Sequence, residues 1–447
     1  MKYLLTLICL IVVGVNKNSV GGSDPMYNCS NCEPQQIHIA FGEENDDIVV
    51  TWTTIGDTQQ SLVQFGMAQD PYLNWEATGQ RTSYENLRGQ WIHRVVLRNL
   101  YFNTTYNYRC GSRFAWSKLF YYTTFPERQA VLRAAIYGDM GVDNAQAIPY
   151  LQQEADTDSI HFILHLGDFA YDMNDDDSHR GDQFMQKIQP FAAIVPFMVC
   201  PGNHEYSKNF TQYKSRMTMP NYEQSESMFY SWNIGPIHFV SINTEAYYFL
   251  NYGLDPLVSQ FRWLVKDLKE ANSKKNRKKQ PWIIMYGHRP MYCSGEEHNN
   301  KANCLEAATR TGLNVPSYTK TFTIEPLLMK YGVDIAIWAH EHMYERTWPL
   351  YDFKVYNGST EQPYLNPRAP IHIVTGAGGC LETPNQFVRL QSDWCAFRST
   401  DYSYTRLHAH NKTHIYFEQV SLNLKGKVID SFWVVQKKHG SFRSKNH

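Results

Sequence analysis

The chain has 447 residues, of which 43% are hydrophobic, and this length predicts about two to four domains at roughly 100–200 residues per domain. Its 42 Lys and Arg residues balance 43 Asp and Glu residues, for a formal net charge of −1. This balance argues against a nucleic-acid binder driven by global charge and against an acidic disordered protein. Aromatic residues make up 14% of the chain, a content that disordered proteins lack.

The first segment of the chain has the pattern of a secretory signal peptide. Lys2 supplies a positive charge, and the apolar run Leu4 to Val13 behind it is short for a membrane span. We expect cleavage around residues 15–22, so that residues 1–22 form the leader; a membrane anchor is the alternative. No other apolar run reaches about 18 residues, so we expect no stable membrane insertion. The predicted destination is the extracellular space or the lysosome.

The chain has nine cysteines, and cleavage of the leader would leave eight. An even number in a secreted chain predicts disulfides. Cys293 with Cys304, and Cys380 with Cys395, are close enough in sequence to be expected as loop-closing pairs. Cys200 lies in an apolar run and is expected to be a buried free thiol. The sequence assigns no partner to Cys29, Cys32 or Cys110.

Asn-x-Ser/Thr sequons support the secretory interpretation, because they predict N-glycosylation of a chain that enters the secretory pathway. They begin at Asn28, Asn103, Asn209, Asn357 and Asn411.

An all-β domain is predicted over residues 33–126. Short runs rich in β-branched and aromatic residues alternate there with Gly, Asn and Asp, which suggests a fibronectin III-like sandwich. The expected strands are residues 37–41, 47–54, 62–66, 93–97, 105–110 and 119–125. A linker around residues 126–128 follows.

The pattern changes beyond the linker, where apolar strands end in polar residues and helical segments separate them. The expected strands are residues 132–137, 161–166, 197–200, 282–286 and 334–338. Residues 259–270 have helical periodicity, and the basic run 274–279 is best explained as a solvated helix end rather than a nucleic-acid patch. This arrangement predicts an α/β domain over residues 130–436, with a C-terminal subregion at about 368–436.

Chemistry-bearing side chains follow these five strands, and ligand sites of open α/β sheets lie beyond the carboxyl ends of strands. Carboxylates with a phenolate suit a trivalent iron, whereas imidazole and amide groups suit Zn, Fe(II) or Mn(II). A carboxylate between two metals can bridge them. The candidates are Asp139, Asp168, Tyr171, Asn203, His204, His288, His340 and His342.

Five short motifs surround the candidate residues: Gly138-Asp139-Met140-Gly141, Gly167-Asp168-Phe169-Ala170-Tyr171, Gly202-Asn203-His204-Glu205, His288 and Ala339-His340-Glu341-His342. With these motifs in this order, the sequence resembles the purple acid phosphatase family of the calcineurin-like metallophosphoesterase superfamily, and especially its animal iron/zinc members. The resemblance covers almost the whole chain after the leader, including the β-sandwich.

The resemblance implies a role for each candidate. Asp139, Tyr171 and His342 would hold Fe(III); Asn203, His288 and His340 would hold the divalent ion, Zn, Fe(II) or Mn; and Asp168 would bridge the two. His204 would contact phosphate, and His298 is the best candidate for a second such histidine and for the general acid. Plant members carry two histidines around this position, so the identity of the general acid stays open.

The implied activity is that of a secreted or lysosomal acid phosphatase, in which metal-bound hydroxide attacks a phosphate monoester. The alternatives are a phosphodiesterase or nucleotide pyrophosphatase on the same fold, and a non-catalytic secreted iron-binding protein. We expect small phosphate esters as substrates and no nucleic-acid partner; the oligomeric state stays open, with a homodimer as one alternative. The spacing of Cys304 and Arg310 matches that of cysteine phosphatases, but the loop lacks the glycines that would cradle phosphate.

Overall fold

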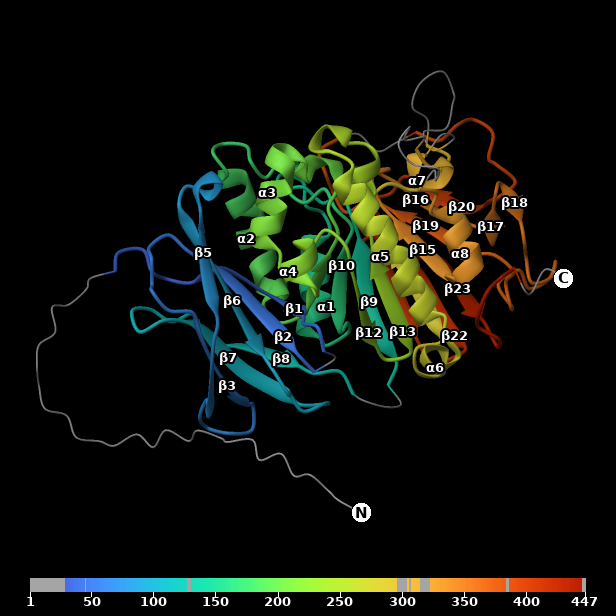
Figure 1. Cartoon of the computed structure of the whole chain (residues 1–447). Helices are drawn as coiled ribbons and strands as arrows, with labels where there is room; N and C mark the ends of the chain where they lie inside the picture. Colours follow the sequence, from blue (N-terminus) through green and yellow to red (C-terminus); the bar gives the residue numbers. More distant parts are fainter. Residues whose placement is uncertain are drawn as a thin grey trace, which may run out of the picture.

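The computed structural model describes residues 29–44, 46–126, 130–295, 304, 307–313, 322–382 and 386–443. The predicted leader, the sequon at Asn28 and the candidate general acid His298 lie outside these residues. Within them, the chain forms a β-sandwich followed by a larger α/β unit (Figure 1).

The N-terminal unit consists of two four-stranded antiparallel sheets. Every residue of β2 (Ile48–Thr54) is buried, because one face of its sheet packs on the other sheet while the second face packs on the α/β unit, where Phe41 of the neighbouring strand stacks on Trp232. One sheet has the order β1 (Gln35–Phe41), β2 (Ile48–Thr54), β6 (Gln90–Leu97), β5 (Gln80–Tyr84). The other has the order β4 (Trp75–Thr78), β3 (Leu62–Met67), β7 (Thr105–Gly111), β8 (Phe120–Thr123), and a short 3₁₀ helix spans Glu85–Leu87.

The α/β unit is built on two mixed sheets that pack face to face. The six-stranded sheet has the order β11 (Phe197–Val199), β10 (Phe162–His165), β9 (Leu132–Tyr137), β21 (Ser403–Ala409), β22 (His414–Ser421), β23 (Lys427–Val435). The seven-stranded sheet has the order β12 (Tyr230–Ile234), β13 (Ile237–Ser241), β14 (Trp282–Tyr286), β15 (Ile335–Trp338), β19 (Ile371–Thr375), β16 (Tyr344–Thr347), β20 (Cys395–Ser399). A ribbon pairs β17 (Leu350–Tyr351) with β18 (Lys354–Val355).

Helices cover the outer faces of both sheets. On the side of the sandwich lie α1 (Ile148–Asp156), α2 (His179–Ala192), α3 (Ser207–Arg216) and α4 (Tyr222–Ser225). On the other side lie α5 (Asp255–Ala271), α6 (Lys274–Lys279), α7 (Ala308–Thr311) and α8 (Glu325–Tyr331). Three further 3₁₀ helices span Asn203–Glu205, Thr244–Tyr247 and Leu250–Tyr252. No helix among the described residues is both long and apolar enough to cross a membrane.

Strand β14 shows why the strands of this unit read as continuous apolar runs. Ile284 and Tyr286 pack in the core between the two sheets, whereas Ile283 and Met285 pack against the outer helices. Both faces of the strand are therefore buried, as expected for parallel strands covered on two sides.

The fold class predicted from the sequence is confirmed, although the sequence did not predict every strand and helix. The sandwich has two strands that the sequence did not predict, β4 and β5, whose residues are mostly exposed. The basic run 274–279 forms a helix of its own, α6, separate from the helix α5 that the periodicity predicted.

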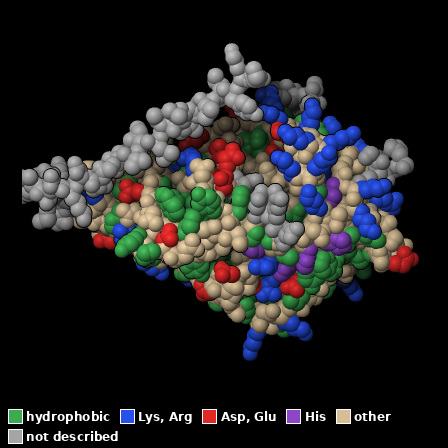
Figure 2. Space-filling view, turned by 90° about the horizontal axis from the view of Figure 1, so that it is seen from below, with side chains coloured by type: hydrophobic (Ala, Val, Ile, Leu, Met, Phe, Trp, Pro, Cys, Tyr) green, Lys and Arg blue, Asp and Glu red, His purple; other side chains and the backbone are tan. Residues whose placement is uncertain are grey.

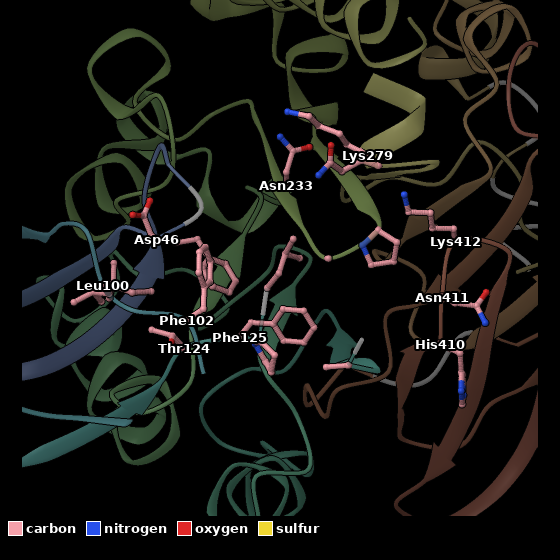
Figure 3. Close-up of a pocket in the computed structure, with 18 of the residues that line it drawn as sticks. Asp46, Leu100, Phe102, Thr124, Phe125, Asn233, Lys279, His410, Asn411 and Lys412 are labelled. Atoms are coloured by element: carbon pink, nitrogen blue, oxygen red, sulfur yellow. The ribbon is translucent and has the colours of Figure 1, made fainter. Parts of the chain in front are cut away.

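A cavity with a volume of about 830 Å³ lies between the two units (Figure 3). Phe102 and Phe125 line it on the side of the sandwich, and Lys279 and Lys412 line it on the side of the α/β unit. Ala130 and Pro236, at its wall, precede β9 and β13. The cavity is therefore at the amino ends of the parallel strands, away from the carboxyl ends where the candidate residues lie.

Candidate metal centre

The candidate residues lie where the structure brings the carboxyl ends of parallel strands of both sheets together. Asp139 follows β9, and Asp168 and Tyr171 follow β10. Asn203 and His204 follow β11, whereas His288 follows β14 and His340 and His342 follow β15. The face-to-face sheets thus supply ligands from two sides.

Several of these residues have a backbone conformation that residues other than glycine rarely adopt. The φ angles of Asp139, Asp168, Tyr171 and His340 are 58°, 53°, 56° and 68°. Left-handed conformations of such residues cost of order 1–3 kcal/mol each and cluster at functional sites. Here they turn the chain sharply at the strand end, which directs the side chain back over the edge of the sheet.

One group of donor atoms is formed by Asp139, Tyr171 and His342. The phenol oxygen of Tyr171 lies 3.3 Å from Oδ1 of Asp139 and 2.7 Å from Nε2 of His342, and that nitrogen lies 3.5 Å from the same carboxylate oxygen. Burial, with Asp139 and Asp168 nearby, holds the pKa of the Tyr171 phenol well above its usual value. A cation at this point would reverse the unfavourable effect of the carboxylates on the phenolate.

A second group of donor atoms surrounds Nε2 of His288. This nitrogen lies 3.1 Å from Oδ1 of Asn203, 3.1 Å from Oδ2 of Asp168 and 3.2 Å from Nδ1 of His340. Nδ1 of His288 donates to the carbonyl of Leu166 at 2.7 Å, which leaves Nε2 without a proton in the neutral ring. An amide oxygen, a carboxylate and two imidazoles converging on one point fit a divalent transition metal.

Asp168 lies in the loop after β10, and hydrogen bonds fix both its backbone and its side chain. Its Oδ1 accepts a hydrogen bond from the backbone N–H of His204 at 2.9 Å. Burial would raise the pKa of the carboxyl group, but His288, His204 and His340 together lower it below its usual value. The group is therefore an anion that already faces a positive environment, as a metal ligand requires.

Gly202 keeps the neighbouring backbone close to Asp168. A Cβ atom at position 202 would lie 2.3 Å from Oδ1 of Asp168 and 2.5 Å from its backbone nitrogen. Any larger residue at position 202 would displace the carboxylate.

His204 lies at the mouth of the site and is 21% exposed. Its Nδ1 lies 3.3 Å from Oδ1 of Asp172, which directs Nε2 toward Asp168, 4.0 Å away. Burial lowers the pKa of this imidazole, but Asp168, Asp172 and two glutamates raise it above its usual value on balance. A hollow of about 160 Å³ beside His204 and Tyr171 leads to the surface.

Three family models match successive parts of the chain. The purple acid phosphatase N-terminal domain matches residues 34–124, the calcineurin-like phosphoesterase matches residues 132–344, and the iron/zinc purple acid phosphatase-like protein C-terminal model matches residues 369–431. The chain is 45% identical over 414 residues to acid phosphatase type 7 of Danio rerio, which covers 91% of this chain and 92% of that protein. It is 44% identical over 408 residues to acid phosphatase type 7 of Homo sapiens, covering 90% and 91%.

The chain belongs to the purple acid phosphatase family. A solved purple acid phosphatase from seeds of yellow lupin (Lupinus luteus) has the same fold, with a TM-score of 0.75 and 24% identity over 91% of this chain and 75% of that one. Membership of the family implies a dinuclear metal centre, and the description matched by the C-terminal residues names iron and zinc.

In this purple acid phosphatase, Glu205 ties together the loops that carry the ligands. Its buried carboxylate accepts hydrogen bonds from the backbone N–H groups of Asp168, Phe169 and Gly202 at 2.8, 3.0 and 2.9 Å. The sequence placed Glu205 in a motif but assigned it no role. The signal was an acidic residue directly after a predicted site histidine.

Arg289 is a second residue that the sequence did not single out. Its Nε donates to the buried carboxylate of Glu245 at 2.8 Å, its Nη1 lies 2.8 Å from Nε2 of His340, and its guanidinium lies over the ring of Tyr248. A cation therefore contacts a candidate ligand of the divalent ion from outside. Its position directly after His288 is the only sequence signal for this contact.

The predicted disulfide between Cys380 and Cys395 is wrong, because both thiols are free and buried. Sγ of Cys380 faces the site, 3.3 Å from Nδ1 of His342. Cys395 packs with Trp394 in the core beneath the outer helices. The two side chains lie in different environments despite their short sequence separation.

The other cysteine predictions can also be compared with the structure. Cys293 and Cys304 form the predicted disulfide, so Cys304 is not available as a nucleophile. Cys29 forms a second disulfide with Cys32. Cys200 is a buried free thiol, as predicted, and Cys110 is free as well.

Proposed function

We propose that this protein is an acid phosphatase that hydrolyses phosphate monoesters at a dinuclear metal centre. The observation that carries the proposal is the pair of donor groups, one around Tyr171 and one around Nε2 of His288, with the carboxylate of Asp168 beside them. The activity named for its relatives, acid phosphatase type 7, also supports the proposal.

In this proposal Asp139, Tyr171 and His342 hold Fe(III), and Asn203, His288 and His340 hold Zn, Fe(II) or Mn, with Asp168 as the shared ligand. The donor types support the division, because the phenol and a carboxylate lie in the first group whereas the amide and two imidazoles lie in the second. When bound, the two cations polarise phosphoryl oxygens and lower the pKa of water.

The charges of the ligands explain why the protein needs no basic surface at the site. Two aspartates and an ionised tyrosine carry three negative charges, whereas a trivalent and a divalent cation carry five positive charges. The loaded centre therefore has a net charge of about +2, which attracts a phosphate dianion. This agrees with the formal net charge of −1 for the whole chain.

His204 orients and stabilises the substrate in this proposal. Its Nδ1–H donates to Asp172, so the protonated ring directs its second N–H, at Nε2, toward the site beside Asp168, where it donates to a phosphoryl oxygen. Donors fixed before the reaction stabilise charge that develops in the transition state without a cost of reorganisation. We assign protonation of the leaving alkoxide to His298, the best candidate that the family resemblance offers.

The proposed location is the extracellular space or the lysosome. The disulfide between Cys293 and Cys304 supports this, because disulfides persist in oxidising compartments. The described sequons at Asn103, Asn209 and Asn411 are exposed, as glycosylation requires, and Asn357 is partly exposed.

The experiment that tests the function combines metal analysis, a visible spectrum and a substrate panel from pH 4 to 7 on one preparation. We expect one iron and one divalent ion per chain and hydrolysis of p-nitrophenyl phosphate. Faster turnover of a diester than of its monoester would identify a phosphodiesterase instead. Two bound metals without hydrolysis at any pH would identify a non-catalytic iron-binding protein.

A further inference from the structure

Exposed lysines gather on one face of the α/β unit, around α6. They come from α6, from the turn between β21 and β22, and from the segment after β23: Lys274, Lys275, Lys278, Lys279, Lys412, Lys437 and Lys438. We call this surface the lysine face. Figure 2 shows Lys and Arg side chains concentrated on part of the underside of the molecule, with histidines beside them. In a chain with a formal net charge of −1, this is a strong local excess of positive charge.

Helix α6 is anchored by its one inward-facing cation. The guanidinium of Arg277 lies 3.2 Å from Oδ2 of the buried Asp334, and it donates to the carbonyl of Tyr331 at 2.8 Å and to Oδ1 of Asn272 at 3.0 Å. Ser273 caps the first turn by accepting from the backbone N–H of Asn276. The helix is thereby fixed in an orientation that directs its lysines to solvent.

The three segments of the lysine face are bonded to one another. The ammonium group of Lys412 donates to the carbonyl of Lys278 at 2.6 Å, and the carbonyl of Lys412 lies 2.8 Å from Nε2 of His439. The backbone N–H of Gln436 donates to the carbonyl of Thr413 at 2.9 Å. The positive charges therefore form one continuous surface rather than three separate patches.

This arrangement is unfavourable for the isolated protein. Lys274 and Lys278, and likewise Lys275 and Lys279, are four residues apart on α6, where like charges destabilise a helix by about 0.2–0.5 kcal/mol per pair. A polyanion that spans the surface would relieve this repulsion and release its own counterions, which favours binding.

An aromatic surface adjoins the lysines. The indole of Trp433 is 45% exposed, and the rings of His410 and Tyr416 lie 4.8 and 4.9 Å from it. His410 belongs to the same turn as Lys412. An exposed ring of this size offers an apolar face on which a planar ring or a sugar can stack.

The compartment decides which polyanion fits. The disulfide between Cys293 and Cys304 places the folded protein in an oxidising environment. Anionic lipids are concentrated in the cytoplasmic leaflet of membranes, so they do not face that environment. Sulfated polysaccharides do, and they combine a dense negative charge with sugar rings.

We propose that the lysine face binds a linear sulfated polysaccharide, with the lysines pairing to sulfate groups and Trp433 contacting a sugar ring. The surface shares no residue with the candidate metal centre. Its occupancy is therefore independent of the phosphatase activity proposed above.

The test uses the full mature protein, enzymatically deglycosylated because a glycan on Asn411 would lie beside Lys412. The ligand is a heparin dodecasaccharide, with desulfated heparin of the same length as the comparison. The lysine-face variant changes Lys274, Lys275, Lys278 and Lys279 to Gln. The control variant changes Lys118, Lys354, Lys425 and Lys427 to Gln; these lysines are exposed, lie elsewhere, and give the same change in net charge. Dissociation constants are measured between 50 and 300 mM NaCl. Circular dichroism checks that each variant is folded, and hydrolysis of p-nitrophenyl phosphate at the wild-type rate is a second check.

We expect the lysine-face variant to bind heparin at least about tenfold more weakly than the wild type and with a shallower salt dependence, because four charge contacts are lost. The control variant should bind heparin like the wild type. Desulfated heparin should bind neither the wild type nor the control variant. Trp433→Ser should weaken binding without changing the salt dependence. Equal loss in both quadruple variants would overturn the proposal.

Two further arms distinguish other polyanions. Vesicles of phosphatidylcholine and phosphatidylserine in a 4:1 ratio, and a single-stranded oligothymidine of matched charge, are titrated under the same conditions. Weaker binding of both than of heparin supports the proposal. Tighter binding of the vesicles would make the surface a membrane site, and equal or tighter binding of the oligonucleotide would make it a general polyanion site; either result overturns the assignment to a sulfated polysaccharide.

Discussion

Nη1 of Arg289 lies 2.8 Å from Nε2 of His340, on the side of the ring opposite to Nδ1, which faces His288 at 3.2 Å. A neutral imidazole carries one proton. If Nδ1 is to bind a cation, the proton must be on Nε2, where the guanidinium also donates. Arg289 therefore opposes loading of the divalent site, both through this hydrogen bond and through its charge.

Arg289→Gln should strengthen binding of the divalent ion. The Gln side chain carries no charge, and its carbonyl can accept the proton on Nε2 of His340. We expect the dissociation constant for Zn²⁺ to fall about tenfold, which corresponds to about 1.4 kcal/mol and lies within the range of one hydrogen bond between neutral groups. Competition with a chelator on metal-stripped protein measures the change. Arg289→Lys keeps the charge and serves as the control; weaker Zn²⁺ binding by the Gln variant would contradict the prediction.

Tyr171→Phe should remove the visible colour of the iron-loaded protein. The proposed origin of the colour is charge transfer from tyrosinate to Fe(III), and Phe has no oxygen to ligate the metal. The absorption spectrum, normalised to iron content, is the measurement. If the colour survives at the same intensity per iron, Tyr171 is not an iron ligand. Tyr206, which is exposed and follows the site histidine by two residues, gives a matched Phe control.

Asp168→Asn should lower both the metal content and the activity, because this carboxylate is the proposed shared ligand. We expect a loss of turnover beyond the 10–100-fold that removal of a supporting group typically costs. Asp172→Asn is the control, since Asp172 contacts His204, which is not a proposed metal ligand. Metal analysis by mass spectrometry should show fewer than two ions per chain for the first variant and two for the second. Full occupancy in Asp168→Asn would refute the bridging role.

The sequence predicted the strand ends well for a physical reason. A strand buried on both faces must be apolar throughout, so the first polar residue after it marks the edge of the sheet. Asp139, Asp168 and His340 were found in this way. The sequence did not predict the ion pair between Arg289 and Glu245. This contact depends on the alignment of β13 with β14, which no local pattern encodes.

The missed strands and the wrong disulfide have different causes. Strands β4 and β5 are held by backbone hydrogen bonds at the edges of the sandwich, and their side chains are mostly exposed, so they carry no hydrophobic alternation. The pairing of Cys380 with Cys395 was inferred from sequence distance alone. Formation of a disulfide depends on the directions of the side chains, which place one thiol at the site and the other in the core.

Glu205→Gln should destabilise the fold around the site. The carboxylate accepts three backbone hydrogen bonds in a buried position, whereas an amide offers one oxygen and would turn its NH₂ group toward an N–H. We expect a loss of about 2–4 kcal/mol in the free energy of unfolding. Hydrogen bonds to charged groups contribute about 1.5–3 kcal/mol each, and the amide oxygen of Gln would still accept part of them. Denaturant titration at neutral pH measures it. Glu223→Gln, on the surface of α4, should have no comparable effect; a similar loss there, or none at Glu205, would contradict the argument.

His38 should make the protein less stable as the pH falls. Its buried ring lies between the carbonyls of Gln36, at 2.9 Å from Nδ1, and of Arg216, at 3.0 Å from Nε2. Burial lowers the pKa of His38 from 6.5 to about 4, although both carbonyls oppose this. Between these values the unfolded chain binds a proton that the folded chain does not, so stability is fully present above pH 6.5 and is lost as the pH falls toward 4.

The loss from this residue amounts to about 3 kcal/mol at pH 4, because one pKa unit corresponds to about 1.4 kcal/mol. His38→Gln carries no titratable group at this position, so the free energy of unfolding should depend less steeply on pH between 6.5 and 4. The two proteins are compared by the change between these pH values, which removes any constant cost of the substitution. His410→Gln, at an exposed histidine, is the matched control for replacing a histidine by glutamine. An unchanged slope in His38→Gln would mean that the ring is charged in the folded protein, where it would donate to both carbonyls and join β1 to the end of α3.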